Sequence, residues 1–390
     1  MTEPLPDLTG LFQPITLAGV TLPNRFVLPG MQRGWCADGA PDERLAAYYR
    51  RRVEGGVGLI VSEAVSVDHP SATRTETFAR LTAATADAWA RCIGAVKDAG
   101  GHLIVQLNHE GAIRRDDGED RWSAHPTISP SGIAFRDRPN GRAADAGDLA
   151  SLRDAFVRSA RLAYDAGADG IEVHGAHGFL LDQFLWDVTN RRDDGYGGDL
   201  AAARVRFPAE IVAAIRAACG PGFLISFRFS QWKEADYTAR VAPTQDDLAV
   251  MCAALKAAGV DVLHASTRRF WEPEWPGSEL NLAGWAKTLS GLPTITVGSV
   301  GLSADVMASF IGDTPVEGRV EQGVRELARR FARGEFDMVA IGRSLIADPD
   351  WVKKVRDGRF DAVRVFTKDD LALPDADLGL VGEAHGVAAS

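Results

Sequence analysis

The chain has 390 residues, of which 46% are hydrophobic and 25% are charged, and its formal net charge is −10. This composition supports a large buried core, and the negative charge argues against general binding to nucleic acid or to an anionic membrane. The four cysteines, at positions 36, 92, 219 and 252, form no CxxC pair, so a cysteine-based zinc or iron–sulfur site is not expected.

The first ten residues, MTEPLPDLTG, contain neither the basic nor the apolar region of a signal peptide. No apolar run approaches the roughly 18 residues that a membrane-spanning helix needs. Together with the sparse cysteines, these features predict a cytoplasmic protein without a membrane partner. The sequence leaves open whether the protein is a monomer or a homo-oligomer.

Short apolar segments rich in Val and Ile alternate with helical patterns along the chain, as is typical of strands covered on both faces. Eight strands are predicted, at Phe26–Gly30, Val57–Ala64, His102–His109, Gly170–Ala176, Phe223–Ser230, Val260–Ser266, Pro293–Ser299 and Asp337–Arg343. A helix such as Leu149–Ala166 carries one apolar stripe, and several helices end in glycine just before the next strand. Eight βα units predict a single-domain (β/α)8 barrel. The alternative is a doubly wound open sheet, which the lack of GxGxxG after the first strand disfavours.

Two insertions and a tail interrupt this alternation of strands and helices. Residues 11–22 resemble a hairpin that closes the bottom of the barrel. The polar segment of about residues 110–147 follows the third strand, so we expect a lid over the catalytic face. The tail after about Phe366 has no obvious role in the core.

The active site of such a barrel forms at the C-terminal ends of the strands. Arg343 and Gly342 suit a phosphate there, because the glycine allows close approach and the arginine provides a forked donor. The backbone of Gly298 and Ser299 on the neighbouring strand adds donors. Arg228 is suited to negative charge on a reduced flavin ring, and Gln106 to the edge of a pyrimidine. Each residue taken alone also fits an ion pair or a buried amide, and their shared location favours a cofactor site.

The pair His174 and His177 follows the fourth strand. Two imidazoles at this spacing can both donate to one substrate oxygen and polarise a carbonyl group. Hydrogen bonding to loop carbonyls is the alternative. Metal ligation is a third possibility, but no third ligand is evident, and no metal site is predicted.

The segment 174–199, HGAHGFLLDQFLWDVTNRRDDGYGGD, resembles the signature of the Old Yellow Enzyme family of NADH:flavin oxidoreductases. The resemblance extends over about residues 8–360. It implies a (β/α)8 barrel with non-covalent FMN, hydride from NAD(P)H, and a small hydrophobic enone, an α,β-unsaturated carbonyl compound, as the acceptor. It assigns His174 and His177 to the substrate oxygen, and the remaining positions to the cofactor: Ala64, Gln106 and Arg228 to the flavin ring, and Gly298, Ser299, Gly342 and Arg343 to the phosphate.

The chain departs from the family pattern at two places. Phe179 stands where the family usually has a proton-donating tyrosine, so the alternative is a related FMN-dependent dehydrogenase, demethylase or isomerase. Pro29-Gly30-Met31-Gln32 replaces the usual Ala/Ser-Pro-Met-Cys/Thr beside the flavin C4 carbonyl, and these four residues are expected to contact the cofactor. A flavin-binding protein without turnover, or a barrel without flavin, is the remaining alternative.

Several aromatic residues follow the predicted strands. We expect Phe179, Trp232, Phe270 and Trp271 to line the substrate pocket, where they would surround a hydrophobic or cationic substrate. Ordinary packing within loops is the alternative for each tryptophan.

Overall fold

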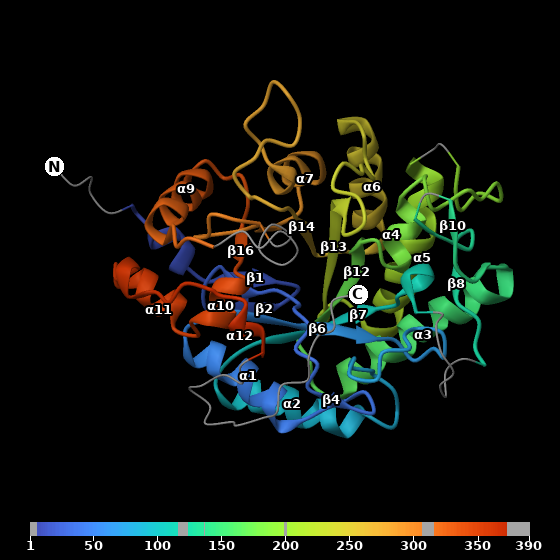
Figure 1. Cartoon of the computed structure of the whole chain (residues 1–390), viewed down its shortest axis with the longest axis horizontal. Helices are drawn as coiled ribbons and strands as arrows, with labels where there is room; N and C mark the ends of the chain where they lie inside the picture. Colours follow the sequence, from blue (N-terminus) through green and yellow to red (C-terminus); the bar gives the residue numbers. More distant parts are fainter. Residues whose placement is uncertain (1–5, 116–123, 136, 199–200, 306–315, 373–390) are drawn as a thin grey trace.

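A computed structural model describes residues 6–115, 124–135, 137–198, 201–305 and 316–372. Eight parallel strands form a closed barrel, which confirms the predicted architecture and excludes the open sheet (Figure 1). In barrel order they are β3 (Phe26–Leu28), β6 (Leu59–Ser66), β7 (Leu103–Asn108), β12 (Gly170–His177), β13 (Leu224–Lys233), β14 (Val262–Ser266), β15 (Thr294–Val297) and β16 (Met338–Ala340). Pairing of β16 with β3 closes the ring.

Helices surround the barrel, and their apolar sides pack against the strands. They are α1 (Glu43–Glu54), α2 (Ala86–Asp98), α3 (Ala146–Asp165), α4 (Leu180–Leu185), α5 (Ala201–Cys219), α6 (Gln245–Ala258), α7 (Leu282–Ser290), α9 (Val320–Ala332), α10 (Arg343–Ala347), α11 (Trp351–Arg356) and α12 (Asp369–Ala372). The side chains of Asp42, Asp145, Thr244 and Asn281 cap the first turns of α1, α3, α6 and α7. Among the described helices, none is both long and apolar enough to cross a bilayer.

The lower half of the barrel is filled with aliphatic side chains. They form one buried cluster of Leu17, Leu22, Val27, Leu59, Val61, Ile104, Leu224, Val262, Ile295, Met338 and Ala340. Leu17 and Leu22 come from the antiparallel hairpin β1 (Ile15–Leu17) and β2 (Val20–Leu22), so this hairpin packs on the N-terminal end of the barrel. Because these described side chains fill that end, a ligand cannot enter the barrel through it.

The segment 110–147 holds the short 3-10 helix η2 (Gly111–Ile113) and the strands β8 (Ile128–Ser129), β9 (Ile133–Phe135), β10 (Arg138–Pro139) and β11 (Arg142–Ala143). Phe135 stacks on Trp186 at 6.1 Å between ring centroids, and β8 contacts α4 beside the barrel (Figure 1). The described residues of this segment therefore lie beside α4, and the lid over the catalytic face stays a prediction. Residues 116–123 and 136 of the predicted lid fall outside the described residues.

The start of the tail has a packing role that its sequence did not indicate. Phe366 is 1% exposed and belongs to a cluster with Leu302, Ile346 and Ala347. It also lies 5.9 Å from the Arg343 guanidinium. Residues 373–390 of the predicted tail lie outside the described residues.

Candidate active site

A cavity of about 390 Å³ opens at the C-terminal ends of the strands. Its volume falls in the range of roughly 300–1,000 Å³ that is typical of small-molecule sites. It brings together fifteen of the predicted site residues: Pro29, Gly30, Met31, Gln32, Ala64, Gln106, His174, His177, Phe179, Arg228, Trp232, Gly298, Ser299, Gly342 and Arg343. These residues come from seven of the eight barrel strands or the loops that follow them.

Two of the predicted pocket residues lie elsewhere, and the prediction for them was wrong. Phe270 is fully buried in the main hydrophobic core, where its backbone N–H donates to the Gly298 carbonyl. Trp271 lines a neighbouring cavity beside α9. Both follow β14, their ring centroids lie 5.4 Å apart, and the Trp271 carbonyl accepts a hydrogen bond from Arg330 of α9 at 2.7 Å.

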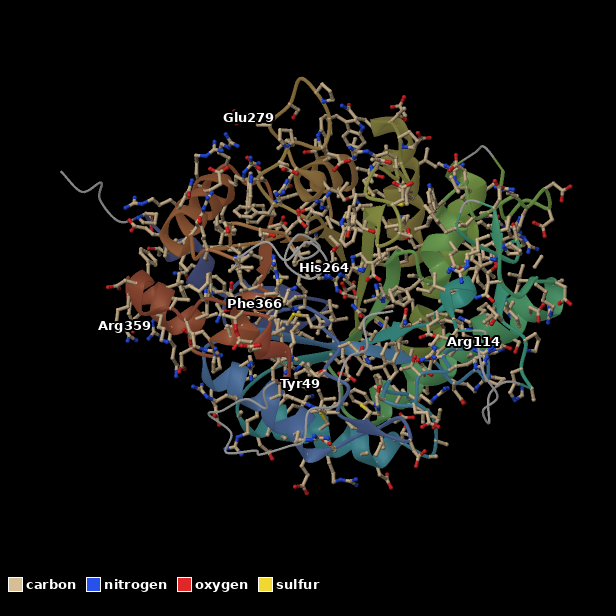
Figure 2. All side chains as sticks on the ribbon, viewed as in Figure 1. Tyr49, Arg114, His264, Glu279, Arg359 and Phe366 are labelled. Atoms are coloured by element: carbon tan, nitrogen blue, oxygen red, sulfur yellow. The ribbon has the colours of Figure 1, made fainter. Side chains whose placement is uncertain are left out.

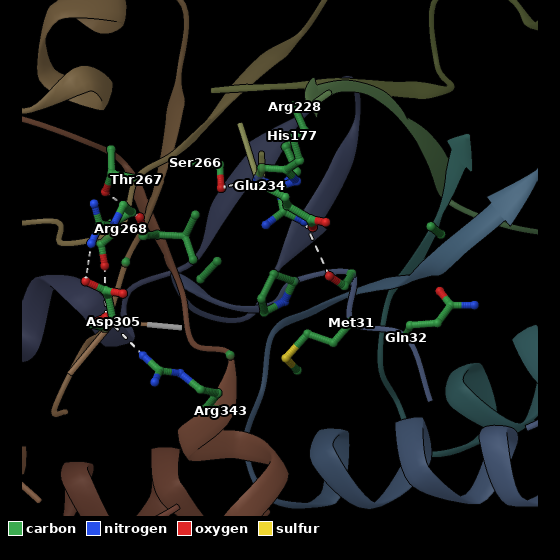
Figure 3. Close-up of a pocket in the computed structure, with 18 of the residues that line it drawn as sticks. Met31, Gln32, His177, Arg228, Glu234, Ser266, Thr267, Arg268, Asp305 and Arg343 are labelled. Carbon is green, nitrogen blue, oxygen red and sulfur yellow. Dashed lines mark hydrogen bonds and ion pairs between the residues drawn. The ribbon is translucent and has the colours of Figure 1, made fainter. Parts of the chain in front are cut away.

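One end of the cavity is suited to an anion. The Arg343 guanidinium donates to Ser299 Oγ at 3.0 Å and to the Ala304 carbonyl at 2.7 Å. Gly298 has φ +153°, and a Cβ there would lie 2.7 Å from Thr267 Oγ1, so only glycine fits. Burial lowers the pKa of Arg343 to about 10, which leaves the guanidinium charged at neutral pH. Figure 3 shows this residue across the cavity from His177 and Arg228.

The opposite end holds a second cation. Arg228 is buried, and it donates one long hydrogen bond of 3.4 Å to the Gly30 carbonyl. Its Nε has no partner among the described residues. A Cβ on Gly30 would lie 2.7 Å from the Ser62 carbonyl oxygen and 2.8 Å from the Gln106 amide, so the backbone must approach closely here. Two cations at opposite ends of one cavity fit a planar group that carries a phosphate, as FMN does.

The two imidazoles form a hydrogen-bonded chain. His174 Nε2 lies 3.2 Å from His177 Nδ1, and His177 Nε2 lies 2.8 Å from Ser266 Oγ. His174 Nδ1 is buried without a partner among the described residues. A substrate oxygen that binds both rings must therefore displace one of these two hydrogen bonds.

The turn that presents His177 is held by buried polar contacts. His177 has φ +64°, an uncommon value for a residue with a side chain, and its N–H donates to Ser230 Oγ at 3.0 Å. The next N–H, of Gly178, donates to Asp182 at 2.6 Å. Asp182 also forms a fully buried ion pair with Lys233 at 2.7 Å. The neighbouring strand thus fixes the backbone of the HxxHG motif.

Burial keeps both imidazoles neutral. Desolvation lowers the pKa of His174 to about 3, helped by the charge of Arg228, and it lowers the pKa of His177 well below its usual range. Each ring therefore has one N–H that can donate and one nitrogen that can accept.

This depressed pKa predicts acid sensitivity. Between pH 6.5 and 3 the unfolded chain binds a proton at His174 that the folded chain does not, so stability falls as the pH falls. Between pH 7 and pH 5 we expect His174 to lower the free energy of unfolding by about 2 kcal/mol. In urea unfolding, His174→Asn should reduce the pH-dependent loss of stability by that amount. Equal losses in the variant and the wild type would contradict the neutral state.

Other lining residues were not predicted. They include Phe78, Glu234, Ser266, Thr267, Arg268 and Asp305. Ser266, Thr267 and Arg268 could have been found, because they stand at the end of the sixth predicted strand, where a barrel places its site residues. Arg268 donates to the buried Asp305 at 2.6 Å (Figure 3). Phe78 lies in a loop far along the chain from any motif, so its place gives no signal in the sequence.

Comparisons with known proteins find relatives that match most of the chain. The model of the NADH:flavin oxidoreductase / NADH oxidase family matches residues 10–311. The chain is 33% identical over 364 residues to an NADH oxidase of Thermoanaerobacter brockii, covering 91% of this chain and 52% of that protein, so it spans about half of that relative. It is 31% identical over 372 residues to the putative 12-oxophytodienoate reductase 13 of Oryza sativa subsp. japonica, covering 93% and 94%. Among solved structures, the Old Yellow Enzyme homologue of Zymomonas mobilis has a TM-score of 0.74 at 23% identity, covering 93% and 96%.

Proposed function

Given that this chain belongs to the NADH:flavin oxidoreductase / NADH oxidase family, whose cofactor is FMN with NAD(P)H as hydride donor, we propose that it reduces the C=C bond of α,β-unsaturated carbonyl compounds. The observation that supports this proposal is a single cavity lined at one end by Arg343 and elsewhere by Arg228 and two neutral imidazoles. These are the groups that FMN and a carbonyl oxygen require.

The cavity residues have different expected roles, which follow from their chemistry. Arg343, with the Gly298–Ser299 backbone, would hold the phosphate, and Arg228 would face the ring. When bound, FMN supplies the redox chemistry by relaying hydride from NAD(P)H to the acceptor. His174 and His177 would donate hydrogen bonds to the substrate oxygen, which withdraws electrons from the double bond. Neutral imidazoles suit this task because they donate without adding a buried charge.

A second candidate is the oxidation of an amine, and two observations favour it. Phe179 has no proton to give to a substrate carbon. Glu234 lines the same cavity as Trp232, and its carboxylate has no hydrogen bond or ion pair with the described residues. Desolvation by the surrounding protein raises the pKa of Glu234, so a cation beside it would be favourable. An aromatic ring with a carboxylate is suited to a substituted ammonium group.

Anaerobic half-reactions separate the two candidates. We expect the purified protein to be yellow, to lose its flavin absorbance with NADPH or NADH, and to regain it with cyclohexenone. Regain with cyclohexenone supports enone reduction. Loss of absorbance with a tertiary amine alone, and no regain with cyclohexenone, would support amine oxidation instead. A colourless protein that takes up no added FMN would contradict both.

The role of the imidazoles has its own test. The variant His174→Ala with His177→Ala should retain FMN, because neither ring contributes to the two cationic ends of the cavity. It should bind phenols about 5- to 150-fold more weakly, since two hydrogen bonds of about 0.5–1.5 kcal/mol each are lost. Titration of the flavin absorbance with p-chlorophenol measures this affinity. Unchanged affinity would remove the oxygen-binding role from the pair.

A further inference from the structure

A layer of polar side chains lies in the barrel between the aliphatic lower half and the cavity. It consists of Gln106 on β7, Glu172 on β12, Ser226 on β13 and His264 on β14, and all four are at most 1% exposed. Figure 2 places His264 near the centre of the molecule. Of these four residues, Gln106 alone lines the cavity, so the other three lie behind the surface that a ligand touches.

Glu172 is the centre of this layer. Its Oε1 accepts a hydrogen bond from Gln106 Nε2 at 2.8 Å, and its Oε2 accepts from Ser226 Oγ and His264 Nδ1, both at 2.8 Å. Burial acts to raise its pKa, but the interaction with His264, the charge of Arg228 and the hydrogen bond from Gln106 outweigh burial and lower the pKa to about 2. Glu172 is therefore a buried carboxylate with three donors.

His264 supplies one of these donors without a charge. Burial lowers its pKa, so the ring is neutral and its proton resides on Nδ1, which faces the carboxylate. His264 Nε2 has no partner among the described residues. The neutral ring does not cancel the negative charge of Glu172, and Arg228, which lines the cavity, is a positive charge that also helps to lower the pKa of Glu172.

The carboxylate fixes the orientation of Gln106. An ionised carboxylate only accepts hydrogen bonds, so Gln106 must direct its NH₂ group toward Glu172. The amide is planar, and its carbonyl oxygen is therefore left for a ligand in the cavity. An acceptor at this place suits a ring N–H, which the pyrimidine of a flavin carries.

We propose that Glu172 is a positioning residue that orients Gln106 toward the flavin and lowers the reduction potential of bound FMN. This inference rests on the proposed function for its cofactor. Reduction adds electrons to the ring, and a buried negative charge behind the ring disfavours added electrons. The positive charge of Arg228 favours the added electrons, and the negative charge of Glu172, in the polar layer behind the cavity, offsets part of that effect.

The test is the midpoint potential of the FMN-loaded protein, measured by anaerobic dye titration. Glu172→Gln should shift the equilibrium at least tenfold toward reduced FMN, which is about 30 mV for a two-electron couple. Glu172→Asp keeps the charge and should stay near the wild-type potential. Asp169→Asn removes the same charge just before β12, at the closed end of the barrel, and should leave the potential unchanged.

The Ser226→Ala variant keeps the buried carboxylate and should shift the midpoint potential in the opposite direction. Loss of one donor leaves the negative charge of Glu172 less compensated, so the potential should fall. If the Glu172→Gln protein fails to fold with FMN, the midpoint potential of Ser226→Ala tests the inference. A wild-type potential in Ser226→Ala, or in a folded Glu172→Gln protein, would overturn the inference, and enone reduction could still hold. A wild-type protein that binds no FMN would instead overturn the proposed function.

Discussion

Replacing Arg343 by methionine is expected to weaken FMN binding by about 10- to 100-fold. A hydrogen bond to a charged group contributes about 1.5–3 kcal/mol, and methionine removes the guanidinium while keeping much of its apolar stem. Ser299 Oγ and the Ala304 carbonyl hold the arginine in place, so its side chain is already ordered before the phosphate arrives. Fluorescence quenching of FMN by the apoprotein measures the dissociation constant.

Riboflavin and a neighbouring arginine provide the controls. Riboflavin lacks the phosphate, so its affinity should change much less than that of FMN in the Arg343→Met protein. Arg269→Met is the matched variant, because Arg269 donates to Glu272 at 2.8 Å and to Asp305 at 3.0 Å but does not line the cavity. An equal loss for FMN and riboflavin would show that Arg343 supports the fold of the site and not the phosphate.

Strand ends were the part of this site that sequence could predict. In a (β/α)8 barrel the C-terminal ends of all strands meet around one opening, so a residue's place along its strand fixes its place in the site. Gln106, His174 and Arg228 each stand at such a place, and they converge although they are far apart along the chain. Their burial and orientation follow from the two-residue alternation of a strand.

Loops and the barrel interior were harder to predict. Phe270 and Trp271 follow a strand by only a few residues, but the direction of a loop depends on contacts that no local pattern encodes. Glu172 had no recognisable signal in the sequence, because the three donors that stabilise its charge come from three other strands. The lid expected at 110–147 rested on polarity and position alone, and the contacts of its described part with α4 had no signal in the sequence.

Phe179→Tyr is expected to accelerate enone reduction by about 100-fold or more. Addition of hydride to a conjugated double bond must be followed by a proton on the neighbouring carbon, and a positioned acid contributes about 10²–10⁴ to such a step. The Phe179 ring lies 4.6 Å from the His174 ring between centroids, and it lines the same cavity. A tyrosine in this place would bring a hydroxyl next to the substrate held by the two imidazoles.

Stopped-flow measurement of the two half-reactions locates the effect. The rate of reduction by NADPH should be unchanged, because that step delivers no proton to a carbon atom, and the rate of reoxidation by cyclohexenone should rise. Phe179→Met controls for the change in shape. If the native reaction is the oxidation of an amine, the tyrosine has no carbon to protonate, and it would leave turnover of that amine unchanged. The same substitution therefore tests the missing proton donor and distinguishes the two candidate reactions, since only the reduction depends on an acid at this position.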